Sequence, residues 1–395
     1  MLALAGAVNY RWKILAMTYF CMLSFAMVFQ SISPLLTLIR DEFSISRAEA
    51  GLLMSFFALP GIIVALPGGI ISDRFGMKKT GIASLVLMVI GTLVVGTSNI
   101  PLQAYVGRIV SGAGGLTLAV VLPQLLSRWF LGKELGVGMG IFNTAMPLGT
   151  ILSFNIFSII GESLNWRMPI FLTTTASIVA LSVFLWLFKE PSGKTSITKN
   201  GTGSSIKKLG PAIWLVGLAW MWFNAAFISF LTFSSDFFVT RGYAIGSAGL
   251  LSSIVMMGSL FLSPLMGYFV YKFGRERAFI GIGGIIIAFL IFLVPTSPVV
   301  IPLLVLIGVF VAFVPAPIFS LPPKLVKPEN MGLAFGIVTA CLNIGILAGP
   351  YFAGLIKDVT GDYSFSFYLM AIFAVLQAVT IALLGLFKLR SEKEV

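Results

Sequence analysis

The sequence contains no histidine, only two cysteines and few charged residues. The missing histidine removes the commonest metal ligand and the side chain that titrates near neutral pH. Cys21 and Cys341 each lie within an apolar run, so we expect neither a disulfide framework nor a zinc site. A nucleotide-binding loop, a paired nucleophile and base, and a metal-ligand cluster are also missing. The sequence therefore predicts neither an enzyme nor a cofactor.

The low charge content points to a membrane environment. Charged residues make up 10% of the 395 positions, hydrophobic residues 58%, and the mean hydropathy is +1.03. A soluble domain carries about 25% charged residues. The apolar runs do not alternate with a period of two, so we expect helices rather than a β-barrel.

Twelve apolar segments are long enough to cross a membrane as helices. They lie at about 14–39, 49–71, 80–97, 101–127, 136–160, 167–188, 211–235, 246–271, 278–295, 299–321, 331–356 and 365–387. This pattern predicts an all-α membrane protein with 12 transmembrane helices.

The basic residues are distributed unevenly between the two sides of these segments. Of the 26 lysines and arginines, Arg108 falls within the membrane and five fall on the side away from the termini: Arg40, Arg47, Arg167, Arg241 and Lys357. The other 20 (26 less these six) fall on the side of the termini. The positive-inside rule then predicts cytoplasmic termini in a plasma (cytoplasmic or inner) membrane. This placement accounts for the net charge of +12 without nucleic acid, and leaves membrane lipids and a small solute as the expected partners.

The two halves of the chain repeat each other. Two glycines and a phenylalanine of the stretch 69–76 return at 267–274, an offset of 198 residues. Residues 189–210, rich in lysine, serine and glycine, are typical of a flexible cytoplasmic linker. We therefore predict two pseudo-symmetric six-helix bundles, over 1–188 and 211–395, an arrangement typical of secondary transporters.

Several motifs resemble those of one family. "GGIISDRFGMKK" at 68–79 resembles the loop between helices 2 and 3 of the major facilitator superfamily, and "RIVSGAG" at 108–114 resembles its helix 4 motif. "WRMPIF" at 166–171 and "DVTGDYSFSF" at 358–367 resemble its helix 6 entry and its helix 11–12 turn. "RWFLGKELGVGMGI" at 128–141 resembles the branches that handle nitrate, cyanate and small organic anions. The resemblance implies transport by alternating access.

The loop at 68–79 supplies the candidate gating residues. Its glycines suit close helix packing and a tight turn, and its bases suit the cytoplasmic face of the membrane. The candidates are Gly69, Asp73, Arg74, Gly76 and Lys78.

Asp73 is an acid in a basic loop, where it opposes the charge rule. The resemblance implies that Asp73 contacts the start of helix 11, near residues 328–332, and latches the cytoplasmic side when the cavity opens outward. Tyr271 stands where the second copy would place this acid, so we expect the second latch to be weaker or absent. The alternative is that the loop only anchors the topology.

Arg108 is the one ionised side chain that falls within the expected spans. A buried arginine is costly and normally faces a partner or a wet cavity. Its planar guanidinium suits a carboxylate or an oxyanion. The resemblance implies a central cavity between the halves, so we interpret Arg108 as a ligand of an anionic substrate. The alternative is a structural arginine bonded to backbone carbonyls.

A few polar side chains lie at similar depth in the expected spans. Each is a candidate hydrogen-bonding group for a substrate, and each also suits a bond to a neighbouring helix. The candidates are Ser24, Ser31, Asn143, Trp222, Asn224 and Asn343.

The sequence thus predicts a monomeric transporter that moves a small, anionic solute by alternating access, with no metal or cofactor. Acids deep in the spans are missing, so no side-chain proton carrier is indicated. Two alternatives stay open: an exporter of amphipathic or neutral compounds, and a membrane sensor on the same fold that transports nothing.

Overall fold

A computed structural model describes residues 2–64, 75–130, 133–190, 209–327 and 330–386, and within these ranges it contains helices and no strand. The first part of the chain forms α1 (Leu2–Gln30), η1 (Ser33–Leu35), α2 (Leu36–Phe43), α3 (Arg47–Val64), α5 (Met77–Gly96), α6 (Pro101–Trp129), α7 (Lys133–Asn143), α8 (Ala145–Leu152), the π-helix η2 (Ser153–Phe157), α9 (Ser158–Ser163) and α10 (Arg167–Leu187). The second part forms α11 (Pro211–Thr240), α12 (Ile245–Phe273), α13 (Glu276–Leu293), α14 (Val300–Val311), α15 (Pro315–Ser320), α16 (Pro322–Leu325), α17 (Met331–Thr360), α18 (Tyr363–Leu383) and η5 (Leu384–Leu386).

Local sequence sets several of these helix boundaries. Pro101 and Pro211 occupy the first position of α6 and α11, where a missing N–H costs no intrahelical bond. Gly274 and Gly361 follow the last residues of α12 and α17 with φ of 58° and 73°, a left-handed conformation that favours glycine.

The helices confirm the expected membrane-protein fold. Eleven helical stretches among the described residues are long and apolar enough to cross a membrane. They correspond to eleven of the twelve expected segments. The remaining one, expected at 49–71, begins as α3 and continues into residues 65–74, which lie outside the described ranges.

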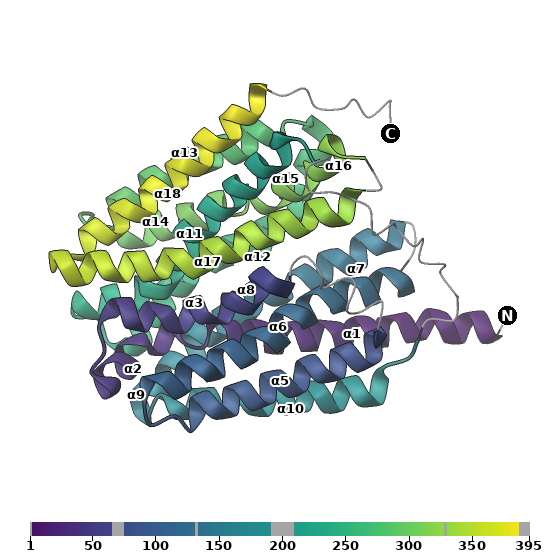
Figure 1. Ribbon diagram of the computed structural model, residues 1–395, viewed down its shortest axis with the longest axis horizontal. Coiled ribbons are helices and arrows are strands. Elements are labelled where there is room, and N and C mark those ends of the chain that lie inside the picture. The colour runs from purple at the N-terminus through teal and green to yellow at the C-terminus, as the bar shows by residue number, and fades with distance from the viewer. Residues whose placement is uncertain (1, 65–74, 131–132, 191–208, 328–329, 387–395) are drawn as a thin grey trace.

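The helices of the two parts lie side by side. Figure 1 shows α1, α5, α6 and α10 below, α13, α14, α17 and α18 above, and both chain termini at one end. We call residues 2–190 the N-half, residues 209–386 the C-half, the end with the termini the terminal end, and the other the opposite end. The domain boundaries stay a prediction, because most of the expected linker at 189–210 lies outside the described ranges.

The halves touch where α3 packs on α17, where the α8–α9 stretch packs on α12, and where α11 meets η1 and α2. Glycines allow the backbones to approach. A Cβ added to Gly51 of α3 would lie 2.7 Å from the Pro350 carbonyl oxygen, and one added to Gly249 of α12 would lie 2.3 Å from the Phe154 carbonyl oxygen. Small residues at such sites are what close helix packing in a membrane requires.

Candidate functional site

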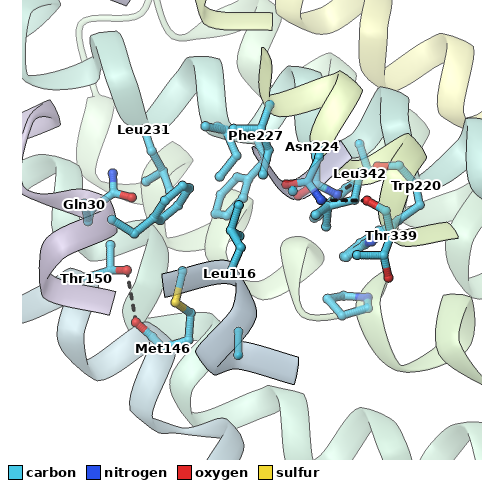
Figure 2. Close-up of a pocket in the computed structure, with 18 of the residues that line it drawn as sticks. Gln30, Leu116, Met146, Thr150, Trp220, Asn224, Phe227, Leu231, Thr339 and Leu342 are labelled. Atoms are coloured by element: carbon cyan, nitrogen blue, oxygen red, sulfur yellow. Dashed lines mark hydrogen bonds between the residues drawn. The ribbon is translucent and has the colours of Figure 1, made fainter. Parts of the chain in front are cut away.

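A cavity of about 450 Å³ lies between the two halves. It is bounded by α1, α3, α6 and α8 of the N-half and by α11, α12, α14, α15 and α17 of the C-half. Figure 2 shows Gln30 and Thr150 on one side, Asn224 and Trp220 on the other, and Leu116 and Phe227 between them. A volume of this size suits a small molecule.

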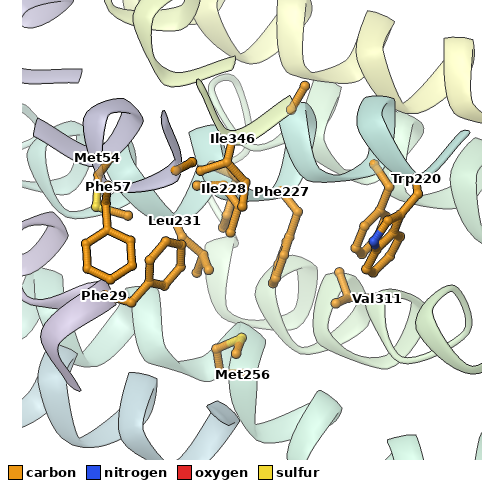
Figure 3. Packing of buried hydrophobic residues seen from close by; sticks show 14 of the residues in the cluster. Phe29, Met54, Phe57, Trp220, Phe227, Ile228, Leu231, Met256, Val311 and Ile346 are labelled. Carbon is orange, nitrogen blue, oxygen red and sulfur yellow. The ribbon is translucent and has the colours of Figure 1, made fainter. Parts of the chain in front are cut away.

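One face of α11 forms the most aromatic wall of the cavity. The lining residues of this helix recur with helical spacing, at Trp220, Phe223, Asn224, Phe227, Ile228 and Leu231. The rings stack along the helix, with centroids 5.1 Å apart for Trp220 and Phe223 and 5.7 Å apart for Phe223 and Phe227. Figure 3 shows Phe227 between Trp220 and the rings of Phe29 and Phe57.

The described residues that line the cavity include no acidic or basic side chain. Their polar members are amides, hydroxyls and an indole: Gln30, Thr150, Trp220, Asn224, Ser259, Thr339 and Asn343. Three of their buried atoms have no hydrogen-bond partner among the described residues, namely Gln30 Oε1, Trp220 Nε1 and Asn343 Oδ1. An unpaired buried polar group costs about 1–3 kcal/mol, so such atoms mark a place where a solute recovers free energy.

Two of the seven predicted substrate ligands, Asn224 and Asn343, line this cavity. Trp222 lies two residues from Trp220, about 200° around the helix, and stacks on Phe373 of α18 at a centroid distance of 5.7 Å. It therefore faces a neighbouring helix.

The other predicted hydrogen-bonding residues also lie away from the cavity. Ser24 and Ser177 of α10 have their hydroxyl oxygens 3.2 Å apart. The Ser31 hydroxyl donates to the Val28 carbonyl over 2.9 Å, and Asn143 is exposed at the end of α7. Their roles as substrate ligands stay predictions.

Arg108 is fully enclosed by the N-half and is not among the lining residues. Its guanidinium donates to the carbonyl oxygens of Leu53 at 2.7 Å, Val28 at 2.7 Å and Phe29 at 2.9 Å. It also lies 4.5 Å from the centre of the Phe57 ring. These are the contacts expected for the alternative, in which Arg108 is a structural arginine bonded to backbone carbonyls. The role of Arg108 as a substrate ligand stays a prediction.

A buried acid connects the halves at the opposite end of the molecule. Asp236 of α11 is 1% exposed. Its carboxylate accepts hydrogen bonds from Thr37 Oγ1 at 2.7 Å, Arg40 Nη1 at 2.9 Å, Arg47 Nε at 3.0 Å, and the Tyr363 hydroxyl. Thr37, Arg40 and Arg47 belong to the N-half, whereas Asp236 and Tyr363 belong to the C-half. We call these five residues the Asp236 cluster.

Two further acids pair with backbone N–H groups of the other half at this end. Asp358 accepts from the backbone N–H groups of Arg47 and Ala48 at 3.0 and 2.7 Å, at the start of α3. Glu162 accepts from the backbone N–H of Gly246 at 2.8 Å, at the start of α12. An acid at a helix N-terminus is favourable because of the helix dipole. The halves are therefore tied together at the opposite end.

Two ion pairs described near the terminal end each join residues of the same half. Arg11 pairs with Glu134 in the N-half, and Lys324 pairs with Glu276 over 2.9 Å in the C-half.

Most of the predicted gating residues fall outside the described ranges. These residues are Gly69, Asp73 and Arg74. The side chain of Tyr271 also lies outside the described part of the structure. Gly76 precedes α5 with φ of 81°, a conformation that favours glycine, and Lys78 is exposed in the first turn of α5. The latch formed by Asp73 stays a prediction.

The sequence analysis missed Gln30, Thr150, Trp220, Ser259 and Thr339 as lining residues. Trp220 had a usable signal, because it lies one helical turn from Asn224 and therefore on the same face. Among the described residues, no group of three His, Cys, Asp or Glu side chains is placed to hold a metal ion.

The family model of the Major Facilitator Superfamily matches residues 18–246 and 239–395. The chain therefore belongs to the Major Facilitator Superfamily. It is a multi-pass membrane transport protein and not an enzyme.

Individual relatives are distant in sequence but match over nearly the whole chain. The chain is 23% identical to the lysosomal dipeptide transporter MFSD1 of Danio rerio over 378 residues, covering 88% of this chain and 81% of the relative. It is also 23% identical to the hexuronate transporter of Bacillus subtilis over 368 residues, covering 86% and 87%. A bacterial homologue of the human lysosomal transporter Spinster, solved in an inward-facing and unoccupied conformation, superposes with a TM-score of 0.77 at 17% identity, covering 95% of this chain and 97% of that one.

Proposed function

We propose that the protein moves a small, uncharged solute with an apolar body across the membrane by alternating access, and binds it in the cavity between the halves. The observation that carries this proposal is the lining of that cavity, which includes no acid or base among the described residues. An ion placed there would lose its hydration without meeting an opposite charge, at a cost of several kcal/mol. Six aromatic side chains supply apolar surface instead: Phe25, Phe29, Trp220, Phe223, Phe227 and Phe319.

The Asp236 cluster acts in this proposal as the gate at the opposite end. It joins the halves through charged hydrogen bonds, and in the other access state these bonds break as the halves separate there. With the termini in the cytoplasm, as the basic residues predict, the closed end faces outward and the described state is inward-facing. A membrane-impermeant thiol reagent added to intact cells should then label a cysteine at exposed Val359 and spare one at exposed Glu190. The reverse pattern would overturn this orientation.

A small anion is the second candidate solute. It is favoured by the hexuronate transporter among the relatives and by the motif at 128–141. The dipeptide transporter has the same sequence identity to this chain as the hexuronate transporter, so these relatives do not distinguish one solute class from another.

Filling the cavity tests whether it holds the solute. Leu342 lines the cavity, and Ile344 lies two residues further along α17 with 40% of its surface exposed. Leu342→Trp should abolish the thermal shift produced by solutes that stabilise the purified protein, and should abolish their flux into proteoliposomes. Ile344→Trp adds a side chain of the same size on another face and should preserve both.

Each other outcome has a definite meaning. A thermal shift that survives in Leu342→Trp would place the solute elsewhere. Binding that is lost in Leu342→Trp, together with no flux in the unmodified protein for any solute that binds, would favour the sensor over the transporter. A screen in which only anions stabilise the protein would favour the second candidate.

A further inference from the structure

The two asparagines that line the cavity are both held by their own helix through the amide nitrogen. The Asn224 amide nitrogen donates to the Trp220 carbonyl over 2.8 Å, and the Asn343 amide nitrogen donates to the Thr339 carbonyl over 2.8 Å. Only the NH₂ group of an amide can donate to a carbonyl, so these bonds determine which atom of each amide is the oxygen. In each residue the amide oxygen is therefore the atom that this bond leaves free to accept, and both residues line the cavity.

Asn343 Oδ1 is buried without a hydrogen-bond partner among the described residues, and the hydrogen bond described for the Asn224 side chain uses its nitrogen and not its oxygen. Both residues are at least nine-tenths buried, with 6% of Asn224 and 1% of Asn343 exposed. The Asn343 amide also has little freedom to turn away. A Cβ added to Gly61 of α3 would lie 2.4 Å from Asn343 Oδ1, which shows how closely the oxygen packs against that glycine. Gly61 and Asn343 belong to different halves, so the position of this acceptor depends on their contact.

One unpaired donor accompanies the two acceptors. Trp220 Nε1 is buried without a partner among the described residues, and Trp220 lies one helical turn from Asn224. Figure 2 shows Trp220 and Asn224 next to each other on the same side of the cavity. The Trp220 ring is nearly parallel to that of Phe223, with 6° between their planes, and the edge of Phe319 completes this aromatic part of the wall.

We propose that this group of residues recognises a neutral polar group that carries N–H or O–H donors together with an acceptor, such as a carboxamide, attached to an aromatic or otherwise apolar body. The donors pair with Asn224 Oδ1 and Asn343 Oδ1, the acceptor pairs with Trp220 Nε1, and the apolar body packs on the aromatic wall. This inference rests on the proposed function, because it assumes that the solute occupies this cavity.

The same geometry disfavours a carboxylate. An ionised carboxylate only accepts hydrogen bonds, so it would place its oxygens against two amide oxygens that only accept as well. Trp220 Nε1 is a single neutral donor and does not offset that repulsion. The specificity therefore comes from unmatched hydrogen-bonding groups, which give stronger discrimination than shape alone.

Three probes of nearly equal size separate charge from hydrogen-bond donation. Benzamide carries donors and an acceptor, acetophenone replaces the NH₂ group by a methyl group, and benzoate replaces it by a charged oxygen. Affinities are measured by calorimetry on the protein in lipid nanodiscs, with empty discs as the reference. We expect benzamide to bind about 10-fold more tightly than acetophenone, as two hydrogen bonds predict, and benzoate to bind most weakly.

Isosteric variants then assign the preference to the asparagines. Asn224→Leu and Asn343→Leu should each reduce the preference of benzamide over acetophenone to about 3-fold or less. Their binding of acetophenone reports that the cavity is still folded. Asn99→Leu changes an exposed asparagine in the turn between α5 and α6 and should leave the preference unchanged.

Equal affinity for benzamide and acetophenone would overturn the donor assignment and leave the uncharged-solute proposal intact. Tightest binding by benzoate would overturn both. No binding of benzamide above empty discs, or a preference that persists in both asparagine variants, would also overturn the assignment.

Discussion

At the scale of single residues, Arg108 shows how a charge is accommodated inside the membrane without a counter-ion. α1 ends at Gln30, so the carbonyls of its last turn have no intrahelical donors. Arg108 donates to two of them, those of Val28 and Phe29. Its positive charge also lies at the negative end of the α1 dipole. Arg108 thereby stabilises the end of α1, where Gln30 lines the cavity.

Replacing Arg108 by lysine should therefore affect stability more than solute affinity. Lysine keeps the charge but does not reproduce the planar fork that reaches three carbonyls at once. We expect Arg108→Lys to lower the stability by on the order of 2 kcal/mol, because a hydrogen bond to a charged group is worth roughly 1.5–3 kcal/mol. The apparent melting temperature of the purified protein should fall, while the affinity for a bound solute should change by less than about 3-fold.

The opposite result would restore the interpretation made from the sequence. A loss of affinity of about 10-fold or more at an unchanged melting temperature would mean that Arg108 contacts the solute. Arg108→Gln, which removes the charge as well, should then lose still more affinity.

At the scale of helices, the sequence predicts well where each helix lies along the chain, but poorly which face of the helix lines the cavity. Twelve apolar runs suffice to predict the spans, because a helix satisfies its own backbone in lipid. The orientation of each helix about its axis is harder, since α11 is apolar on every side and periodicity does not mark its cavity face. Asn224 was found because an amide is rare there. Trp220 and Trp222 lie on opposite faces of α11, and the only sequence signal that favours Trp220 is its position one helical turn from Asn224.

The contact between α3 and α17 depends on Gly61. An alanine methyl group there would lie 2.4 Å from Asn343 Oδ1 and 2.7 Å from Leu116 Cδ1, so these side chains must move. We expect Gly61→Ala to weaken benzamide binding several-fold by displacing the Asn343 amide. Gly136→Ala in α7 is the matched control, because a Cβ at Gly136 meets nothing within 4 Å. An unchanged affinity in Gly61→Ala would show that the α3–α17 contact does not position Asn343.

At the scale of the whole molecule, the charged hydrogen bonds described between the halves lie at the opposite end. Arg40 and Arg47 were singled out in the sequence only as bases on the minority side of the membrane. Their acid, Asp236, is 196 residues from Arg40 along the chain. Such a pairing depends on how two bundles dock, and neither composition nor periodicity carries that information. The Asp236 cluster was for this reason missed, whereas the family resemblance directed attention to Asp73.

Removing the charge of Asp236 should shift the molecule toward the state that is open at the opposite end. Asp236→Asn removes the buried carboxylate that Arg40 and Arg47 share, and breaking a fully buried pair costs roughly 3–5 kcal/mol. Both arginines are partly exposed, so we expect on the order of 2 kcal/mol, or about a 30-fold change in the equilibrium between the two states. Spin labels at exposed Leu164 and Val359, one on each half, should report longer distances.

Asp362→Asn provides the control for this measurement. Asp362 is exposed at the same end, but it caps α18 within the C-half, where the backbone N–H of Ser364 lowers the pKa of its carboxyl group. The same amide substitution there should leave the distance distribution unchanged. Equal distributions in wild type and Asp236→Asn would rule out the Asp236 cluster as a gate.

The uncharged cavity lining also determines how transport responds to membrane voltage. Moving one elementary charge through 100 mV changes the free energy by about 2.3 kcal/mol. No described residue of the lining carries a charge. When the cavity changes from one access state to the other, empty or loaded with solute, these side chains therefore move no charge through the membrane field. Exchange of an uncharged solute in proteoliposomes should proceed at the same rate with and without an imposed potassium diffusion potential. A rate that changes several-fold with the potential would reveal an ion that travels with the solute.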